Sequence, residues 1–208
     1  MENLTVTQIE QGLTNTNFRL YENSQQEGHS IFLRLYTDIT PREDINILSR
    51  LNQQGFGAKI LSMFEEGRIE EWLEGRIMKR EDLTVENIKK LAQIMKKFHT
   101  MGICHNDLNL TNIFIKTSGE LVIIDWEYCR ENGDILYDIA NFFVEWMYDY
   151  GANDWYKPRR ELFATREEMG IFCQEYGDGI SMEDILSKIP EVHNFLGKMG
   201  GRVTPRRI

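Results

Sequence analysis

The residues whose types and spacing could do chemistry are concentrated in residues 104–128. Asp107 lies in a polar loop, and Asn112 follows it five residues later. A short apolar segment, a turn and a second apolar segment then lead directly to Asp125. We expect these two segments to be strands of a hairpin, which brings its two ends together. The loop with Asp107 and Asn112 is therefore predicted to lie beside Asp125.

This set of side chains suits phosphoryl transfer. Asp107 could accept the proton of an attacking hydroxyl, while Asn112 and Asp125 offer the hard oxygen ligands that Mg²⁺ prefers. The alternative is a polar surface loop followed by an ordinary buried hairpin. An acid at the buried end of an apolar strand costs free energy unless it is paired or metal-bound, so we favour the catalytic interpretation.

The elements that must position these residues are strands in the first part of the chain and helices in the rest. Alternating apolar residues predict strands, and apolar residues spaced by three or four predict helices. The strands are expected at 4–9, 18–21, 31–36 and 56–64. The helices are expected at 41–51, 84–101, 137–150, 165–176 and 181–188, with a last short helix starting at Pro190 and no helical pattern in 197–208.

Arg34 is a charge in the middle of an apolar strand. With a period of two, Arg34 shares one face of the strand with Phe32 and Tyr36. A cation in such a place requires an anion, and a phosphate group would satisfy it. The alternative is an arginine on an edge strand that points to solvent.

The segment 137–150 combines acids with aromatic residues. On a helix, Glu145 and Asp149 would share a face, and Trp146 and Tyr150 would form an adjacent aromatic pair. Acidic groups beside aromatic rings hold organic cations through charge attraction and cation–π contacts. Packing in a core is the alternative, and we expect it for Trp146.

Composition limits the class of partner. The net charge of −9 makes nucleic acid a poor partner and favours a cationic small molecule. The three cysteines form no C-x-x-C pair, which predicts reduced thiols and a cytoplasmic protein. The first ten residues do not resemble a signal peptide, and no apolar run is long enough to predict a membrane span.

The motif H-x-D-x-x-x-x-N, followed by a hairpin and an Asp, resembles the kinase-like fold that protein kinases share with aminoglycoside phosphotransferases. The longer strings CHND, NIF, IDWEY and YDIANFFVEWMYDY resemble choline and ethanolamine kinases more specifically. The resemblance implies an α+β fold of two lobes with the site between them. Residues 1–75 would form an N-terminal lobe with an antiparallel sheet, and residues 76–208 a larger, mostly helical C-terminal lobe.

The resemblance also implies how ATP is held. The turn at 12–17 would cover the phosphates, Arg34 would steady them, and backbone groups near residues 71–73 would take the adenine edge. An acid of the following helix, Asp44 or Glu43, would pair with Arg34. The residues implied for nucleotide binding are Thr14, Asn15, Arg34, Glu71, Trp72 and Leu73.

The activity implied is transfer of a phosphoryl group from ATP, with Mg²⁺, to the hydroxyl of choline or ethanolamine, the first step towards phosphatidylcholine or phosphatidylethanolamine. Asp107 would be the catalytic base and touch the substrate, with Asn112 and Asp125 as magnesium ligands. The cationic head would be held by Tyr128, Glu145 and Tyr150. A homodimer is also implied.

The resemblance fails at the C-terminus, where nothing matches the family's W-x-x-W helices, and this predicts a shortened chain. Two other functions stay open at this point. One is a phosphotransferase of the same fold acting on an aminoglycoside or sugar, with Glu127, Glu145 and Asp149 binding amino groups. The other is a non-catalytic form that binds a full-length partner.

Overall fold

The computed structural model describes residues 4–9, 15–22, 30–37, 45–150, 152, 154 and 157–200. Its chain divides into two compact units. The first contains residues 1–76 and 115–127, and the second contains residues 77–114 and 128–208. The division predicted from sequence assigns everything after residue 75 to the second part. The structure instead places 115–127, which ends just beyond Asp125, with the first unit.

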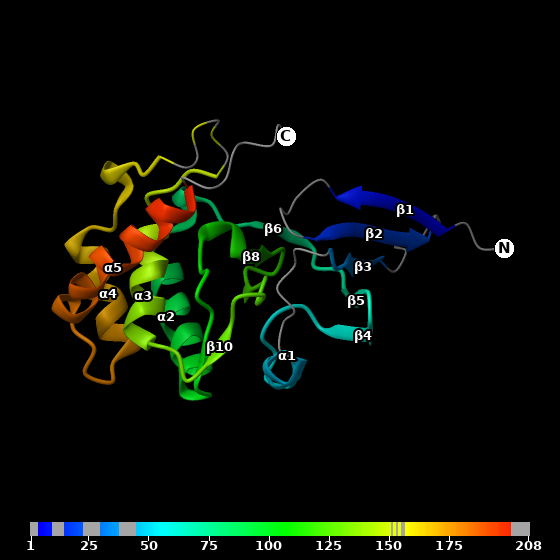
Figure 1. The fold of residues 1–208 in the computed structure, drawn as a ribbon, viewed down its shortest axis with the longest axis horizontal. Helices are drawn as coiled ribbons and strands as arrows, with labels where there is room; N and C mark the ends of the chain where they lie inside the picture. The colour runs from blue at the N-terminus through cyan, green and yellow to red at the C-terminus, as the bar shows by residue number, and fades with distance from the viewer. Residues whose placement is uncertain are drawn as a thin grey trace. The chain divides into compact units, whose positions relative to one another are not determined.

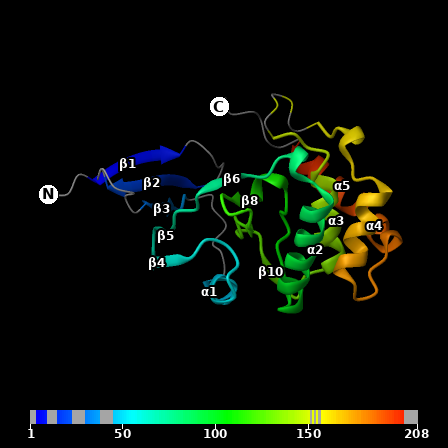
Figure 2. The same cartoon turned by 180° about the vertical axis from the view of Figure 1, so that it is seen from behind.

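The first unit is built on a five-stranded antiparallel sheet with the order β1-β2-β3-β5-β4 (Figures 1 and 2). Its strands form where the sequence alternates, as predicted for the first three, whereas the strand expected from residue 56 begins only at Ile60. A short helix, α1, follows β3 in the chain. The bounds are β1 Leu4–Ile9, β2 Thr16–Glu22, β3 Ser30–Leu35, β4 Ile60–Phe64, β5 Gly67–Glu71 and α1 Ile45–Gln53.

The register of this sheet decides which side chains can meet. Arg34 of β3 lies directly opposite Arg68 of β5 and, on its other side, opposite Asn17 of β2. Successive residues of a strand point to opposite faces, so Glu70 shares a face with Arg68 and therefore with Arg34. The sheet thus gathers two arginines and one glutamate on the same face.

The second unit is a cluster of helices (Figures 1 and 2) in which α2 contacts α4 and α3 contacts α5. Each of the first three begins at a cap that the sequence supplies. Thr84 accepts a hydrogen bond from the backbone of Asn87, Asp134 caps α3, and Thr165 and Glu168 form a capping box. The helices are α2 Val85–Thr100, α3 Ile135–Glu145, α4 Arg166–Tyr176 and α5 Met182–Gly200.

The core of the second unit is aromatic. The rings of Phe142 and Phe143 on α3 lie 5.8 and 5.2 Å from that of Phe172 on α4. Trp146 is 1% exposed and contacts both α3 rings, which confirms its predicted place in the core. Rings in such contacts stabilise beyond the area they bury. They hold α3, and the polar residues on it, in one position against α4.

Short elements carry the chain through the loop region. Two pair as a small ladder, β7 with β10, and three form a sheet with the order β6-β8-β9. The pairing of β8 with β9 is the hairpin predicted before Asp125. The bounds are β6 Gly75–Ile77, β7 Ile103–Cys104, β8 Ile113–Lys116, β9 Leu121–Ile123, β10 Arg130–Glu131, and the 3₁₀ turns η1 Arg80–Asp82, η2 Leu110–Asn112 and η3 Arg160–Leu162.

Two predicted helix ends are wrong. The helix expected to reach residue 150 stops at Glu145 and is followed by turns. In the last part of the chain, α5 runs through Pro190 into the segment 197–200, where no helix was predicted. Proline removes one backbone donor, and its ring crowds the carbonyl of the preceding turn. Ile185 and Val192 are fully buried on either side of it, and this burial outweighs the local signal. Among the described residues, no helix is long and apolar enough to cross a membrane.

Gly67 offers a test of the sheet. A Cβ added there would lie 2.1 Å from the carbonyl oxygen of Arg34, a backbone atom that cannot turn away. We predict that Gly67→Ala lowers the free energy of unfolding by roughly 2–4 kcal/mol. Gly170→Ala is the matched control, because its Cβ would meet nothing within 4 Å and it lies inside α4, where alanine should stabilise by about 0.5–1 kcal/mol. Urea titration measures both, and equal effects would contradict the assigned register.

Candidate active site

Asp107 lies in the loop between β7 and η2 of the second unit. Its backbone N–H donates to the ring Nδ1 of His105 at 3.3 Å, and its carboxylate accepts from the side-chain amide of Asn112 at 3.1 Å. Its side chain is half-buried. Hydrogen bonds within the loop therefore hold Asp107 at its backbone and at its carboxylate.

Asp138, a fully buried residue of α3, holds the backbone of this loop. Its two carboxylate oxygens accept the backbone N–H groups of His105 and Asn106, each at 2.7 Å. A neighbouring residue of the same helix, Asn141, accepts the N–H of Leu108 at 3.0 Å. Hydrogen bonds to a charged acceptor are short and strong. Helix α3 thus fixes the backbone on both sides of Asp107.

His99 continues this network into two other helices. Its Nε2 lies 3.0 Å from Asp138, and its Nδ1 lies 2.9 Å from the hydroxyl of Tyr176 on α4. These contacts give His99 a structural role. Asp138 was not singled out from the sequence. The signal was present, because an acid in the otherwise apolar stretch of α3 must find donors.

His99, Cys104 and Asp138 also place three potential metal-binding atoms within 4.8 Å of one another. However, Asp138 and both ring nitrogens of His99 already have protein partners. Burial, with the charge of Asp138 adding to it, raises the pKa of the Cys104 thiol to about 12. A protonated thiol is a poor ligand. The hydrogen-bond network accounts for this cluster without an ion.

The side chain of Asn112 is oriented by Asp107. Its side-chain N–H₂ group donates to the carbonyl oxygen of Asp107 at 2.8 Å and to the carboxylate at 3.1 Å. Because the amide nitrogen faces Asp107, the carbonyl oxygen of the side chain is directed elsewhere. This is the atom that would bind Mg²⁺.

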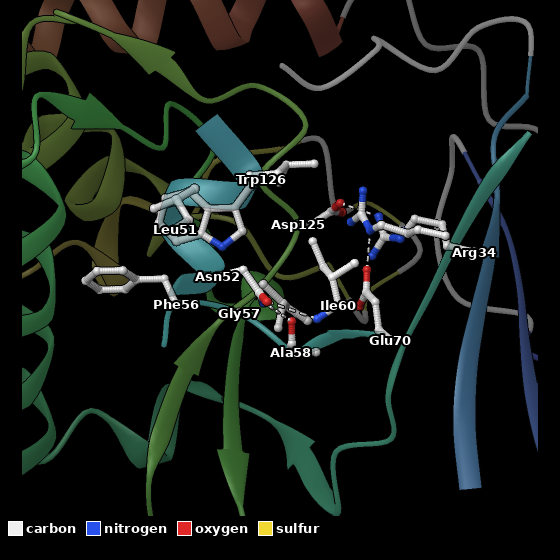
Figure 3. A pocket seen from close by; sticks show the side chains of 13 residues that line it. Arg34, Leu51, Asn52, Phe56, Gly57, Ala58, Ile60, Glu70, Asp125 and Trp126 are labelled. Carbon is white, nitrogen blue, oxygen red and sulfur yellow. Dashed lines mark hydrogen bonds and ion pairs between the residues drawn. The ribbon is translucent and has the colours of Figure 1, made fainter. Parts of the chain in front are cut away.

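Asp125 belongs to the first unit, directly after β9 and Ile124. Its carboxylate accepts from the Nη1 of Arg34 at 2.8 Å, and Figure 3 shows the two side chains facing each other. Arg34 is only 7% exposed. Its predicted need for an anion is therefore met by Asp125. The predicted proximity of Asp107 and Asn112 to Asp125 involves residues of different units and stays a prediction.

All six residues predicted for the nucleotide belong to the first unit. Thr14 is outside the described residues, as are Glu43 and Asp44, and Asn15 is half-buried just before β2. At the end of β5, Glu71 pairs with Lys59 through backbone and side chain. The ring of Trp72 lies under the guanidinium of Arg19 at 4.3 Å and 6.5 Å from Phe32, and Leu73 is half-buried. Their roles toward adenine stay predictions.

Glu145 is the most unusual acid of the second unit. It is 1% exposed, and its Oε2 accepts the hydroxyl of Tyr150 at 2.6 Å. Its Oε1 is buried without a hydrogen-bond partner among the described residues. Burial raises its pKa to about 7, although hydrogen bonds from Tyr150 and Asn141 act in the opposite direction. A buried carboxylate oxygen without a donor is costly and suits a site that receives a cation.

Tyr150 is bonded to Glu145 and is close enough to Asp107 to respond to its charge. Burial of its hydroxyl raises its pKa, and the charges of Glu145 and Asp107 raise it further. The residue is nevertheless 37% exposed, which means that its ring reaches the surface while its hydroxyl points inward to Glu145. Asp107, Tyr150 and Glu145 are therefore electrostatic neighbours.

Two other predictions for this region have different outcomes. Asp149 does not share a helical face with Glu145, because α3 ends before it, and it forms an ion pair with Arg159 at 2.8 Å. Tyr128 is 37% exposed, and its carbonyl oxygen accepts from Asn106 at 3.0 Å. Its place beside the cationic head of a substrate stays a prediction.

These features define an α+β fold of the protein-kinase-like type, and comparison with solved structures bears this out. An ethanolamine kinase of Plasmodium vivax matches with a TM-score of 0.67 and 21% identity, covering 95% of this chain and 73% of that one. A choline kinase of Cryptosporidium parvum matches with a TM-score of 0.64 and 18% identity, covering 95% and 78%. At these identities the likeness shows the fold.

The family follows from sequence comparison. The model described as choline/ethanolamine kinase matches residues 6–103 and 100–198, so the chain belongs to that family. A choline/ethanolamine kinase of Rattus norvegicus is 24% identical over 263 aligned positions, which cover 90% of this chain and 66% of that protein. An ethanolamine kinase of Saccharomyces cerevisiae is 34% identical over 83 positions, 36% of this chain and 15% of that one. The chain thus spans about two thirds of the length of the rat relative.

Glu145→Gln tests the burial of this acid without reference to activity. The folded-state pKa, about 7, lies above the ordinary value of 4.5. The stability that Glu145 contributes is therefore present below pH 4.5 and is lost as pH rises through 7, by roughly 3 kcal/mol. Glutamine cannot ionise, so we predict that the variant is more stable than the parent at pH 8 and gains little at pH 5. Urea titrations at both pH values measure this. The exposed Glu161→Gln should show no such dependence, and a constant difference for Glu145→Gln would contradict the prediction.

Proposed function

We propose that this chain transfers the γ-phosphoryl group of ATP to the hydroxyl of choline or ethanolamine. The observation that carries the proposal is Glu145, a buried carboxylate with one oxygen unpartnered among the described residues, next to the hydroxyl of Tyr150. A cationic head group at Glu145 would bring its own hydroxyl arm into the neighbourhood of Asp107. Membership of the choline/ethanolamine kinase family supports the same substrates.

Asp107 is assigned as the base. Its carboxylate would orient the substrate hydroxyl and accept its proton as the oxygen bonds to phosphorus. Asp138 anchors the loop backbone and thereby keeps Asp107 in one position. Positioning is most of what phosphoryl transfer requires. Glu145, with Tyr150 and Tyr128, would hold the ammonium group by charge and cation–π attraction.

Asn112 and Asp125 are assigned to Mg²⁺, and Arg34 to the phosphates of ATP. The donors fit, because a side-chain amide oxygen and a carboxylate are ligands that magnesium accepts. When bound, the ion would neutralise charge on the phosphates. The remaining nucleotide contacts are assigned to Thr14, Asn15 and the segment Glu71 to Leu73. We also propose a cytoplasmic location, since the three cysteines are free thiols, and a homodimer remains a family-based proposal.

The aminoglycoside or sugar alternative receives less support. It needs several acids for amino groups, yet Asp149 is neutralised by Arg159. A single buried acid with one adjacent tyrosine suits a small monocation better.

Asp107→Ala tests the chemical assignment. We predict that kcat falls at least about a thousandfold with choline and with ethanolamine, because the base is removed while the binding residues remain. A coupled assay with ATP and Mg²⁺ measures turnover, and calorimetry should give nearly unchanged ATP affinity. Glu167→Ala, an exposed acid on α4, is the control. Retained turnover in Asp107→Ala would overturn the assignment, and activity confined to sugars or aminoglycosides would overturn the substrate class.

The pH dependence tests the cation site separately. Choline carries its charge at every pH, so a change in its binding reports the enzyme. Because Glu145 binds the cation only when ionised, kcat/KM for choline should fall below a pH of about 7, and Glu145→Gln should lower it and remove that bend. The KM for ATP serves as the internal control. A bend that persists unchanged in Glu145→Gln would assign the titration to another group.

A further inference from the structure

Arg34 lies within a group of four charges in the first unit, three of which are buried. Arg68 faces it across the β3–β5 ladder, and Glu70 is the next residue of β5 on the same face. Arg34, Arg68 and Glu70 are 7%, 4% and 8% exposed. Glu70 accepts a hydrogen bond from the Nε of Arg68, and Asp125 accepts from Arg34. Two cations and one anion are thus buried together, and a second anion, Asp125, is partly buried beside them.

Both acids stabilise the positive charge of Arg34. Burial alone would lower the pKa of this guanidinium, and the charge of Asp125, followed by that of Glu70, overcomes burial and raises it. In Figure 3 the carboxylates of Asp125 and Glu70 both point toward the end of Arg34. These two acids come from different elements, the exit of β9 and the middle of β5.

Asp125 and Glu70 cannot neutralise the charge of Arg34 to the same extent during the reaction. Under the proposed function Asp125 is a magnesium ligand, and an oxygen bound to a metal no longer neutralises an arginine fully. Glu70 has no such second task, because Arg68 holds it within the sheet. A cavity of about 30 Å³, lined by Arg34, Arg68, Glu70 and Asp125 among others, gives the guanidinium room for a small shift (Figure 3). The Nε of Arg34 also has no hydrogen-bond partner among the described residues.

We infer that Glu70, fixed by Arg68, is the positioning residue that holds Arg34 toward the phosphates of ATP, while Asp125 would hold Mg²⁺. The inference rests on the proposed function. It gives a β5 residue the task that family resemblance assigns to an acid of the helix after β3. Glu70 itself touches neither substrate nor metal and acts through Arg34.

Glu70→Gln is the first test, because it keeps the shape of the side chain and removes its charge. The affinity for ATP with Mg²⁺, measured by calorimetry, should weaken about tenfold. The KM for ATP should rise by a similar factor, while the KM for choline should stay within about twofold. Glu66→Gln, an exposed acid in the turn before β5, is the matched control and should leave every constant unchanged.

Glu70→Gln also removes the acid that pairs with the buried Arg68, and this alone can destabilise the fold. The double variant Arg68→Gln/Glu70→Gln removes both charges of that pair and should fold even where the single variant does not. If Glu70 acts on Arg34, the double variant still binds ATP about tenfold more weakly than the parent. If its ATP affinity equals that of the parent, Glu70 serves only Arg68 and the inference is overturned.

Arg34→Gln separates this inference from the proposed function. Weaker ATP binding in Arg34→Gln supports the phosphate role of Arg34, and adding Glu70→Gln to it should then cause no further loss, because Glu70 acts through Arg34. A further loss of ATP affinity in that combination would overturn the inference alone. Unchanged ATP binding in Arg34→Gln would overturn the phosphate assignment, and with it the inference.

Discussion

The carboxylate of Asp138 is the interaction on which the second unit's part of the site depends. An acid with no exposed surface is costly unless its oxygens are satisfied, and here two backbone N–H groups and the ring of His99 satisfy them. The satisfied acid joins α2, α3 and the loop before Asp107, and Tyr176 adds α4. Because the contacts to the loop are made to backbone, they fix its path directly. The aromatic core around α3 then gives this anchor a rigid base.

In the first unit, buried charges are compensated by other charged side chains. Arg34 and Arg68 lie opposite each other within the sheet, with acids close to both. Such a group is balanced as long as no ligand enters. A ligand that withdraws one acid shifts the balance toward positive charge, which attracts anions. In the second unit, one carboxylate oxygen of the buried Glu145 has no hydrogen-bond partner among the described residues, and a cation would stabilise it. The two units thus present complementary preferences, each created by burial.

Local signals in the sequence predicted where helices begin better than where they end. Thr84 and the pair Thr165 and Glu168 announce helices because a cap is made by residues within one turn. The end of α3 at Glu145 and the passage of α5 through Pro190 depend on what the helices contact, and a local pattern contains no such information.

The same distinction applies to the candidate site. Asp107, Asn112, Asp125 and Glu145 were predicted as site residues because their residue types and their order in the chain indicate chemistry. Asp138 and the pair Arg68 and Glu70 were missed, since their importance comes from partners far away in sequence. Asp149 was assigned to the substrate because a longer helix was expected, and its true partner, Arg159, follows ten residues later.

Asn106 and Asp125 share an uncommon backbone conformation, with φ of 64° and 63°. Asparagine and aspartate tolerate this region better than most residues, but it still costs on the order of 1 kcal/mol, and glycine would adopt it freely. At both positions the side chain makes a contact that glycine could not, to the carbonyl of Tyr128 and to Arg34. An engineer who relieves backbone strain to raise thermal stability would find these two positions inviting. Glycine at either position would remove a side-chain contact with a residue of the proposed site, Tyr128 or Arg34. The gain in thermal stability would therefore come with a loss of order in the site.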